Sequence, residues 1–190
     1  MARSTIIGPV RFSYCHLLEP DTRDGSPKYS VSILIDKNDE GVVATVKEAI
    51  RAAYSEGASV FGPKCPPITS LKLPLRDGDT ERDDDVYSGK YFVNCYAKTR
   101  PGIVKFGPNG NKVPVEGPED IYSGCYGYVA VRFYAYNNNG NRGISCGLNN
   151  VLVTEKGESL GGGESADESF RDIQPVKPVG SVAAAGLEDW

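Results

Sequence analysis

The sequence predicts a mainly β domain, a small closed or partly open antiparallel β-barrel with one helix. Three observations favour this fold class. Gly and Pro supply 35 of the 190 residues, well above their ordinary share of about 12%, which indicates many short elements joined by turns. Several segments alternate apolar and polar residues at period two, and a single segment repeats its apolar residues at helical spacing. A barrel suits such a chain because closure leaves no edge strand exposed.

The first two strands are expected at residues 4–15 and 28–36. In the second of these, apolar residues occupy the odd positions from 29 to 35, and Lys or Ser occupies positions 28, 30 and 32. This alternation is typical of a strand with one buried face. Residues 19–27 contain two prolines, a glycine and two aspartates, so a loop is expected between the two strands.

Residues 39–56 are expected to form the helix. Asn38 or Asp39 can cap its first turn, and Gly57 is a suitable residue for its end. Four apolar residues recur at helical spacing and form one buried stripe. The stripe consists of Val43, Val46, Ile50 and Ala53.

The remainder of the domain is expected to be irregular at first and then rich in strands. Residues 57–89 are interrupted by prolines, and they include an acidic run, DGDTERDDD, at 77–85. Three strands and a small hairpin follow. The strands are expected at 90–100, 124–137 and 142–153, and the hairpin at 103–115. The turn between the last two strands contains an Asn-Gly pair, which indicates a β-hairpin.

The charges divide along the chain in a way that the formal net charge of −4 conceals. Residues 157–190 have a net charge of −5 and few large apolar residues, so they are expected to form a flexible acidic tail after a domain at 1–156. Outside the acidic run at 77–85, the domain has 18 basic and 12 acidic residues. A basic binding surface is therefore compatible with an acidic total.

Two of the expected strands place rings and cations on one face. The even positions of 90–100 and of 126–136 combine aromatic residues with Lys, Arg or Asn, whereas the odd positions are mostly apolar. The ring-and-cation faces contain Lys90, Phe92, Asn94, Tyr96, Lys98 and Arg100, and Tyr126, Tyr128, Arg132, Tyr134 and Tyr136. Such faces are typical of proteins that bind single-stranded nucleic acid, because bases stack on rings and cations contact phosphates.

The ring-and-cation faces and the acidic run are also compatible with different roles. Cross-strand tyrosine pairs stabilise sheets without any ligand, and the helix can cover such a face. The acidic run also allows a small metal-dependent nuclease that uses Asp77, Asp79 and Asp83 around Mg²⁺. A structural virion β-protein would instead pack its tyrosine face against other subunits.

Several classes of protein are disfavoured. No apolar run approaches the roughly 18 residues that cross a bilayer, and the first residues lack the apolar centre of a signal peptide. The five cysteines are widely spaced without a C-x-x-C pair, so reduced thiols are expected in place of disulfides or a zinc site. His16 is the single histidine. We therefore expect no cofactor, no metal and no catalytic residue.

Three stretches of the chain carry a family resemblance. They are KYSVSILIDK at 28–37, PLRDGDTERDDDVYSGKYFVNCYAKTRPGIV at 74–104 and DIYSGCYGYVAVRFYAYNNNGNRGISCGLNNV at 120–151. Together they resemble the single-stranded-DNA-binding proteins of tailed bacteriophages, over about residues 5–163. The resemblance implies a five-stranded OB-fold that coats single-stranded DNA during phage replication or recombination, in the cytoplasm of the bacterial host. The usual OB-fold helix follows the third strand, whereas the helix expected here follows the second. Either a strand near residues 68–75 has been missed, or the topology is modified.

Single-stranded-DNA binding assigns a role to residues of the two faces and to several other cations. The rings expected to stack on bases are Phe92, Tyr96, Tyr128, Tyr134 and Tyr136. The cations expected to contact phosphates are Arg11, Lys28, Lys98, Arg100, Lys105, Arg132 and Arg142. Asn94 is expected to donate to a base edge or a sugar. Glu188, Asp189 and Trp190 end the tail and are expected to dock on phage or host replication or recombination proteins. A homodimer is left open, and no membrane partner is expected.

Overall fold

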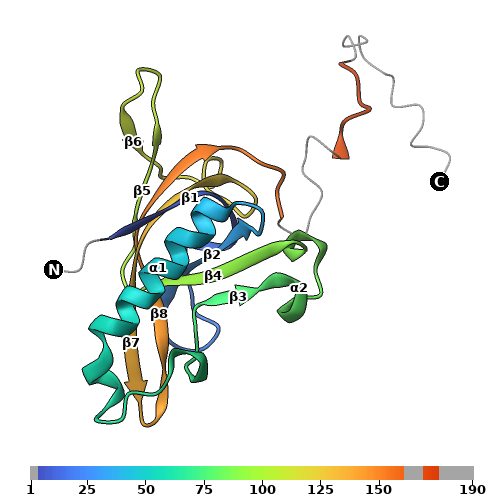
Figure 1. Ribbon diagram of the computed structural model, residues 1–190. Helices are drawn as coiled ribbons and strands as arrows, with labels where there is room; N and C mark the ends of the chain where they lie inside the picture. Colours follow the sequence, from blue (N-terminus) through green and yellow to red (C-terminus); the bar gives the residue numbers. More distant parts are fainter. Residues whose placement is uncertain (1–3, 161–168, 176–190) are drawn as a thin grey trace, which may run out of the picture.

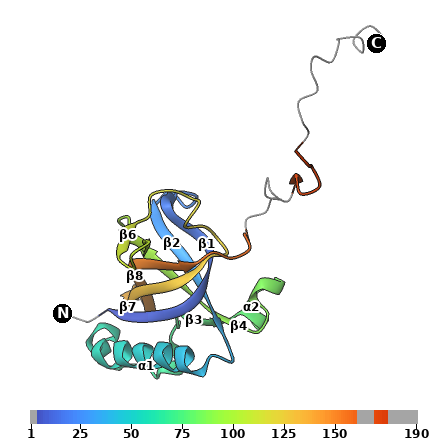
Figure 2. The ribbon, with the colours of Figure 1, turned by 90° about the horizontal axis from the view of Figure 1, so that it is seen from above.

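The computed structural model describes residues 4–160 and 169–175, and within them eight strands form one sheet that closes on itself (Figures 1 and 2). Five of the strands make the barrel. They are β1 (Thr5–Asp21), β2 (Lys28–Asp36), β4 (Lys90–Ala97), β7 (Tyr126–Asn138) and β8 (Asn141–Glu155). The barrel closes where β4 pairs with β8 at Tyr96 and Gly147. This pairing is parallel, so the expected five-stranded barrel is confirmed, although it is not antiparallel throughout.

Strand β1 is longer than expected because the chain continues to pair with β2 beyond a bulge. The register shifts between Ser13 and His16, where Tyr14 adopts a left-handed backbone with φ of 47°. Pairing then resumes, and it ends where Asp21 faces Lys28. The loop between the strands is correspondingly shorter than the predicted 19–27.

Helix α1 (Glu40–Glu56) confirms the expected position, cap and apolar stripe. Asp39 accepts a hydrogen bond from the Val42 amide at 3.3 Å, and all four residues of the stripe are buried. The helix packs against β1 and β7 (Figure 2). A Cβ at Gly57 would collide with the Cβ of Ala135, so the end of the helix approaches β7 as closely as a glycine permits.

The position of α1 settles the question of topology. The helix lies between the second and third barrel strands, β2 and β4, so the usual OB-fold order is modified. A short strand, β3 (Leu75–Asp77), does occur near the suspected region. It pairs with β4 at the edge of the sheet and is not part of the barrel.

The segment expected to be irregular contains several short elements. They are η1 (Ala58–Phe61), η2 (Ile68–Ser70), β3, α2 (Gly78–Glu81) and η3 (Asp85–Tyr87). Helix α2 is a single turn that the sequence did not predict. Next to it, Tyr87 packs on Leu34 and Phe92 and forms a second, smaller core on the outside of the barrel.

The remaining elements follow the expectation. Strands β5 (Gly102–Phe106) and β6 (Lys112–Pro114) form the predicted hairpin, which projects from the barrel (Figure 1). Strands β7 and β8 form the second hairpin. Inside the barrel, the Sγ atoms of Cys95 and Cys146 lie 3.5 Å apart. All five cysteines are free thiols.

Candidate functional site

A polar groove of about 360 Å³ lies on the outer face of β1, β2 and β4. The β2 strand contributes the small side chains of Ser30 and Ser32, whereas larger side chains such as Tyr14, Arg82 and Tyr96 come from the neighbouring elements. The lining residues are Tyr14, His16, Asp21, Arg23, Lys28, Ser30, Val31, Ser32, Arg82, Asn94 and Tyr96. The strand register explains why they meet, since Ser30 pairs with both His16 and Tyr96, and Ser32 pairs with Asn94.

Three of the predicted site residues, Lys28, Asn94 and Tyr96, therefore lie together in this groove. The Tyr96 side chain is 40% exposed, and the Lys28 ammonium lies 5.2 Å from the centre of its ring. An exposed ring with a cation above it and an amide beside it offers stacking, charge and hydrogen bonding to one ligand.

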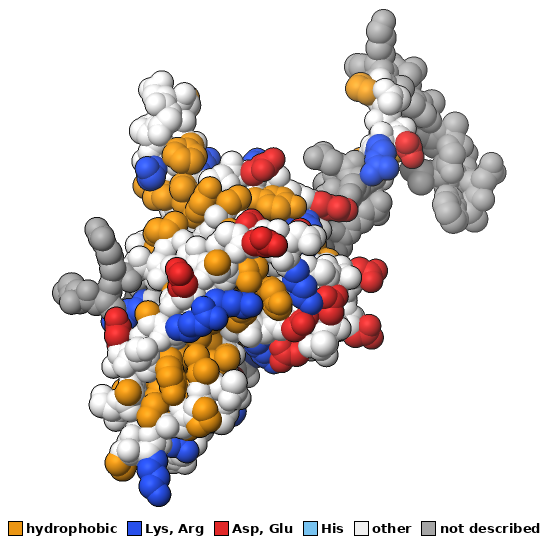
Figure 3. Space-filling view, in the orientation of Figure 1, with side chains coloured by type: hydrophobic (Ala, Val, Ile, Leu, Met, Phe, Trp, Pro, Cys, Tyr) orange, Lys and Arg blue, Asp and Glu red, His pale blue; other side chains and the backbone are white. Residues whose placement is uncertain are grey.

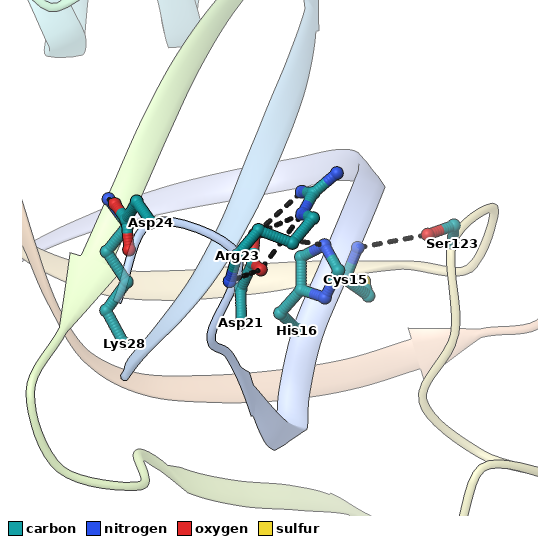
Figure 4. A network of polar contacts seen from close by, with 7 residues as sticks. All are labelled: Cys15, His16, Asp21, Arg23, Asp24, Lys28 and Ser123. Atoms are coloured by element: carbon teal, nitrogen blue, oxygen red, sulfur yellow. Dashed lines mark hydrogen bonds and ion pairs between the residues drawn. The ribbon is translucent and has the colours of Figure 1, made fainter. Parts of the chain in front are cut away.

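The cations at the loop end of the groove are paired with carboxylates (Figure 4). Asp21 accepts from the Arg23 guanidinium, with a shortest distance of 2.6 Å, and lies 4.0 Å from His16. Lys28 donates to Asp24 at 2.7 Å. The Arg23 guanidinium holds the pKa of Asp21 well below its usual range, and Asp24 raises the pKa of Lys28. Both cations stay charged at neutral pH.

Two further predicted residues lie beyond the seam of the barrel on the same outer surface. Gly147 of β8 pairs with Tyr96 on one side and with Arg132 on the other. Tyr134 is the next outward residue of β7, and it is 40% exposed. Because Gly147 has no side chain, nothing projects from β8 at this position between Tyr96 and Arg132.

The structure contradicts the prediction that Phe92 stacks on a base. The alternation of β4 places it on the outer face, but it is 0% exposed. Tyr87 covers it edge-on, with ring centres 5.2 Å apart, and the guanidinium of Arg82 lies 5.1 Å from its ring centre. Phe92 therefore cannot offer its ring to a base, and it belongs to the second core.

Two other predicted rings lie away from the groove. Tyr128 lines a separate apolar groove beside β5, together with Ile6, Val104 and Phe106. Figure 3 shows hydrophobic side chains gathered in the region of β5. Tyr136 is half-buried near the far end of β7. The even face of β7 is thus divided between surfaces that a single groove does not join.

The predicted phosphate contacts also divide. Arg11, Lys105 and Arg142 already bind protein oxygens: Arg11 donates to the Gly124 and Glu158 carbonyls, Lys105 to the Asp120 carboxylate, and Arg142 to the Phe61 carbonyl. Lys98 and Arg100 follow the end of β4 and are exposed. Arg100 lines another hollow, whose lining also includes Glu116. These five cations do not line the groove.

Sequence reasoning missed the other eight residues of the groove, among them Tyr14, Ser32 and Arg82. Tyr14 is 51% exposed, but the bulge in β1 breaks the alternation that would have marked it. Arg82 lies in the acidic run, and its guanidinium lies over the rings of Tyr14 and Tyr87 at 5.6 and 5.3 Å. No local sequence pattern connects these residues, because they come from three distant elements.

The acidic run is bound to the protein through Lys37. The Lys37 ammonium donates to Asp77 at 2.7 Å and to Asp79 at 2.6 Å, which lowers the pKa of both carboxyls. Figure 3 shows acidic side chains gathered on the side of α2, with cations among them. Across the residues that the structure describes, no group of three or more His, Cys, Asp or Glu is arranged to hold a metal ion.

A closed five-stranded barrel with a polar groove over its second and third strands defines the oligonucleotide- and oligosaccharide-binding class of folds. Within this class, the family model described as "Enterobacter phage Enc34, ssDNA-binding protein" matches residues 3–177. The chain belongs to this family, and the resemblance seen in the sequence is confirmed.

Individual relatives agree with this assignment. Putative protein p50 of Acyrthosiphon pisum secondary endosymbiont phage 1 is 29% identical over 174 residues, which cover 86% of this chain and 90% of that protein. The single-stranded DNA-binding protein of bacteriophage Enc34, solved in complex with ssDNA, is 25% identical with a TM-score of 0.69, over 82% of this chain and 88% of that one. The single-stranded DNA-binding protein gp2.5 of bacteriophage T7 shares the fold alone, at 14% identity and a TM-score of 0.58, over 93% of this chain and 99% of that one.

Proposed function

We propose that this chain binds and coats single-stranded DNA, without strong sequence preference, during replication or recombination of phage DNA in the bacterial cytoplasm. The observation that carries the proposal is the groove over β2 and β4, where Tyr96, Asn94 and Lys28 meet. Family membership supports it, as does the Enc34 relative whose structure contains ssDNA. Stacking on a ring is tolerant of sequence because every base has a π-face.

The proposed path of the strand extends from the groove across Gly147 to Arg132 and Tyr134. Bases stack on Tyr96 and Tyr134, and phosphates are neutralised by Lys28 and Arg132. Asn94 donates to a base edge or a sugar. The path follows neighbouring strands of the barrel, so successive nucleotides meet successive rings.

The protein is proposed to act by binding and not by catalysis. The nuclease alternative has little support, because Asp77 and Asp79, two of its three carboxylates, are engaged by Lys37. None of the helices within the described ranges has the length and apolar character needed to cross a bilayer. The proposed docking of Glu188, Asp189 and Trp190 on replication or recombination proteins concerns residues outside the described ranges.

The test is a titration of 5′-labelled oligo(dT) with the full chain, followed by fluorescence anisotropy at four salt concentrations. The logarithm of affinity should fall linearly with the logarithm of salt, by about 0.7 per phosphate neutralised. Oligo(dA) and oligo(dC) should bind within roughly tenfold of oligo(dT). Absence of binding, or an affinity insensitive to salt, would refute the proposal, and cleavage of the oligonucleotide with added Mg²⁺ would support the nuclease.

A further inference from the structure

The end of the groove away from the β1–β2 loop contains three residues with unused binding capacity, Tyr14, Ser32 and Arg82. Tyr14 is an exposed ring on a left-handed backbone, which is a rare and strained conformation for a bulky residue. Such strain persists only where the surrounding structure enforces it, and it clusters at binding sites. The conformation at the bulge places the Tyr14 ring at the mouth of the groove.

Ser32 supplies an independent observation. Its side chain is 3% exposed and lines the groove. Among the residues that the structure describes, the Ser32 hydroxyl is the one buried polar side-chain group that has no hydrogen-bond partner. A buried hydroxyl without a partner is unfavourable unless a ligand or water completes it. Ser13, which pairs with Ser32 across the strands, is satisfied by the hydroxyl of Tyr87 at 3.1 Å.

Arg82 supplies the charge. Its guanidinium lies over the rings of Tyr14, Tyr87 and Phe92, and no described carboxylate forms an ion pair with it. It differs in this respect from Arg23 and Lys28, whose charges are compensated by aspartates. A planar cation stacked on rings keeps its edge free to bind phosphate.

The acidic motif that precedes Arg82 fixes its place. Lys37 connects Asp77 and Asp79, and Asp79 also accepts from the Gly89 amide at 2.9 Å. The single turn of α2 is thereby attached to the end of β2 and to the start of β4. The turn ends at Arg82, whose amide donates to the Gly78 carbonyl at 3.3 Å.

We propose that Tyr14, Ser32 and Arg82 form a subsite for one nucleotide at the end of the groove away from the β1–β2 loop. The base stacks on Tyr14, the Ser32 hydroxyl completes its hydrogen bonding on the base edge or sugar, and Arg82 binds the phosphate. Asp77 and Asp79 are positioning residues that hold Arg82 in the subsite. The inference rests on the proposed function. It also explains why acidic residues, Asp77 and Asp79, lie beside a groove that is proposed to bind DNA.

The subsite is tested with the oligo(dT) titration. Arg82→Gln should reduce the steepness of the salt dependence by about 0.7, the contribution of one phosphate, whereas Arg51→Gln, an exposed cation on α1, should not change it. Tyr14→Ala should weaken binding by about 5- to 150-fold, which corresponds to the loss of one stacked base, and Tyr14→Phe should bind as the wild type does. Ser32→Ala should weaken binding without lowering the melting temperature, because the hydroxyl has no partner in the free protein.

The positioning role predicts a change opposite in sign to that of simple electrostatics. Removing a negative charge near DNA ordinarily strengthens binding. Asp79→Ala should instead weaken binding, whereas the matched control Asp83→Ala, an exposed acid without a hydrogen bond or ion pair among the described residues, should leave the affinity equal or higher. In an Arg82→Gln background the effect of Asp79→Ala should disappear.

The outcomes separate this inference from the proposed function. If the wild type binds and Tyr96→Ala weakens binding, but Arg82→Gln leaves the salt dependence unchanged, the subsite is wrong and DNA binding stands. If the wild type does not bind, the proposed function itself fails. Tighter binding by Asp79→Ala, or an effect of Asp79→Ala that persists without Arg82, would overturn the positioning role.

Discussion

Phe92 and Tyr96 provide a sharp comparison within one strand. Both lie on the outer face of β4, four residues apart, and the sequence assigns both to base stacking. The structure buries Phe92 completely and leaves Tyr96 40% exposed. We expect Phe92→Ala to reduce the stability of the fold, and Tyr96→Ala to reduce the affinity for single-stranded DNA.

The magnitudes follow from burial. Removing a fully buried Phe side chain costs about 3–5 kcal/mol of unfolding free energy, which for a domain of this size lowers the melting temperature by about 6–20 °C. Tyr96 contributes less to stability, because its ring is partly in water. The cation–π pair of this ring with Lys28 is worth about 0.5–1 kcal/mol at an exposed site. Loss of the Tyr96 ring should weaken DNA binding by about 1–3 kcal/mol if it stacks on one base.

The assay pairs thermal unfolding, followed by circular dichroism, with anisotropy titrations of oligo(dT) at a temperature where every variant is folded. Phe92→Leu and Tyr96→Phe serve as conservative controls that keep most of the buried volume and the ring, respectively. A Phe92→Ala variant as stable as the wild type but weak in DNA binding would refute the reasoning. Tyr87 and Arg82 would then not cover Phe92 in solution.

Three other predictions follow from the same structure. Arg132→Gln should reduce the steepness of the salt dependence of oligo(dT) affinity by about 0.7, and an unchanged slope would remove Arg132 from the DNA path. Deleting residues 161–190, which carry a net charge of −4, should raise the affinity in anisotropy titrations at low salt; an unchanged affinity there would argue against a tail that competes with DNA. Lys37 lowers the pKa of Asp77 and Asp79, so these carboxyls stabilise the fold above their unfolded pKa of about 3.9 and lose that contribution as the pH falls. The melting temperature of Lys37→Met, measured by calorimetry, should therefore fall less steeply than that of the wild type between about pH 5 and pH 3, and equal slopes would show that the Lys37 contacts do not stabilise the fold.

Local patterns were sufficient to locate the barrel strands and helix α1, although not the parallel pairing of β4 with β8 that closes the barrel. The alternation of residues 28–36 located β2 to the residue, and the apolar stripe of α1 is buried as predicted. In both cases the signal lies within one element, because a face that packs on the core repeats at the period of its strand or helix. The expectation of a single buried face was wrong for β2, since Ser32 and Leu34 on its other face are buried too. The β7–β8 hairpin was equally visible, since its turn residues lie between two alternating runs.

The site was less visible because its residues meet through non-local contacts. Alternation showed that Phe92 faces outward from the barrel, but it carried no information on the segment at 78–87 that folds back over that face. The same segment brings Arg82 to Tyr14, a contact between residues 68 positions apart. A pattern with a period of two or of 3.6 residues contains nothing about such a pair.

The net charge of the sequence also gives little information about the site, because it does not show which charges are paired. A net charge of −4 describes the chain, but the groove responds to which charges are already compensated. Asp21 and Asp24 engage Arg23 and Lys28, so these cations must exchange a carboxylate for a phosphate when DNA binds, and the exchange reduces their net contribution to affinity. Arg82 has no such partner among the described residues and can bind a phosphate without breaking an ion pair. The acidic run that contains Arg82 therefore opposes DNA binding less than its charge suggests, because Lys37 neutralises part of it. The contacts of the same run also hold Arg82 in the groove, where its guanidinium is free to bind a phosphate.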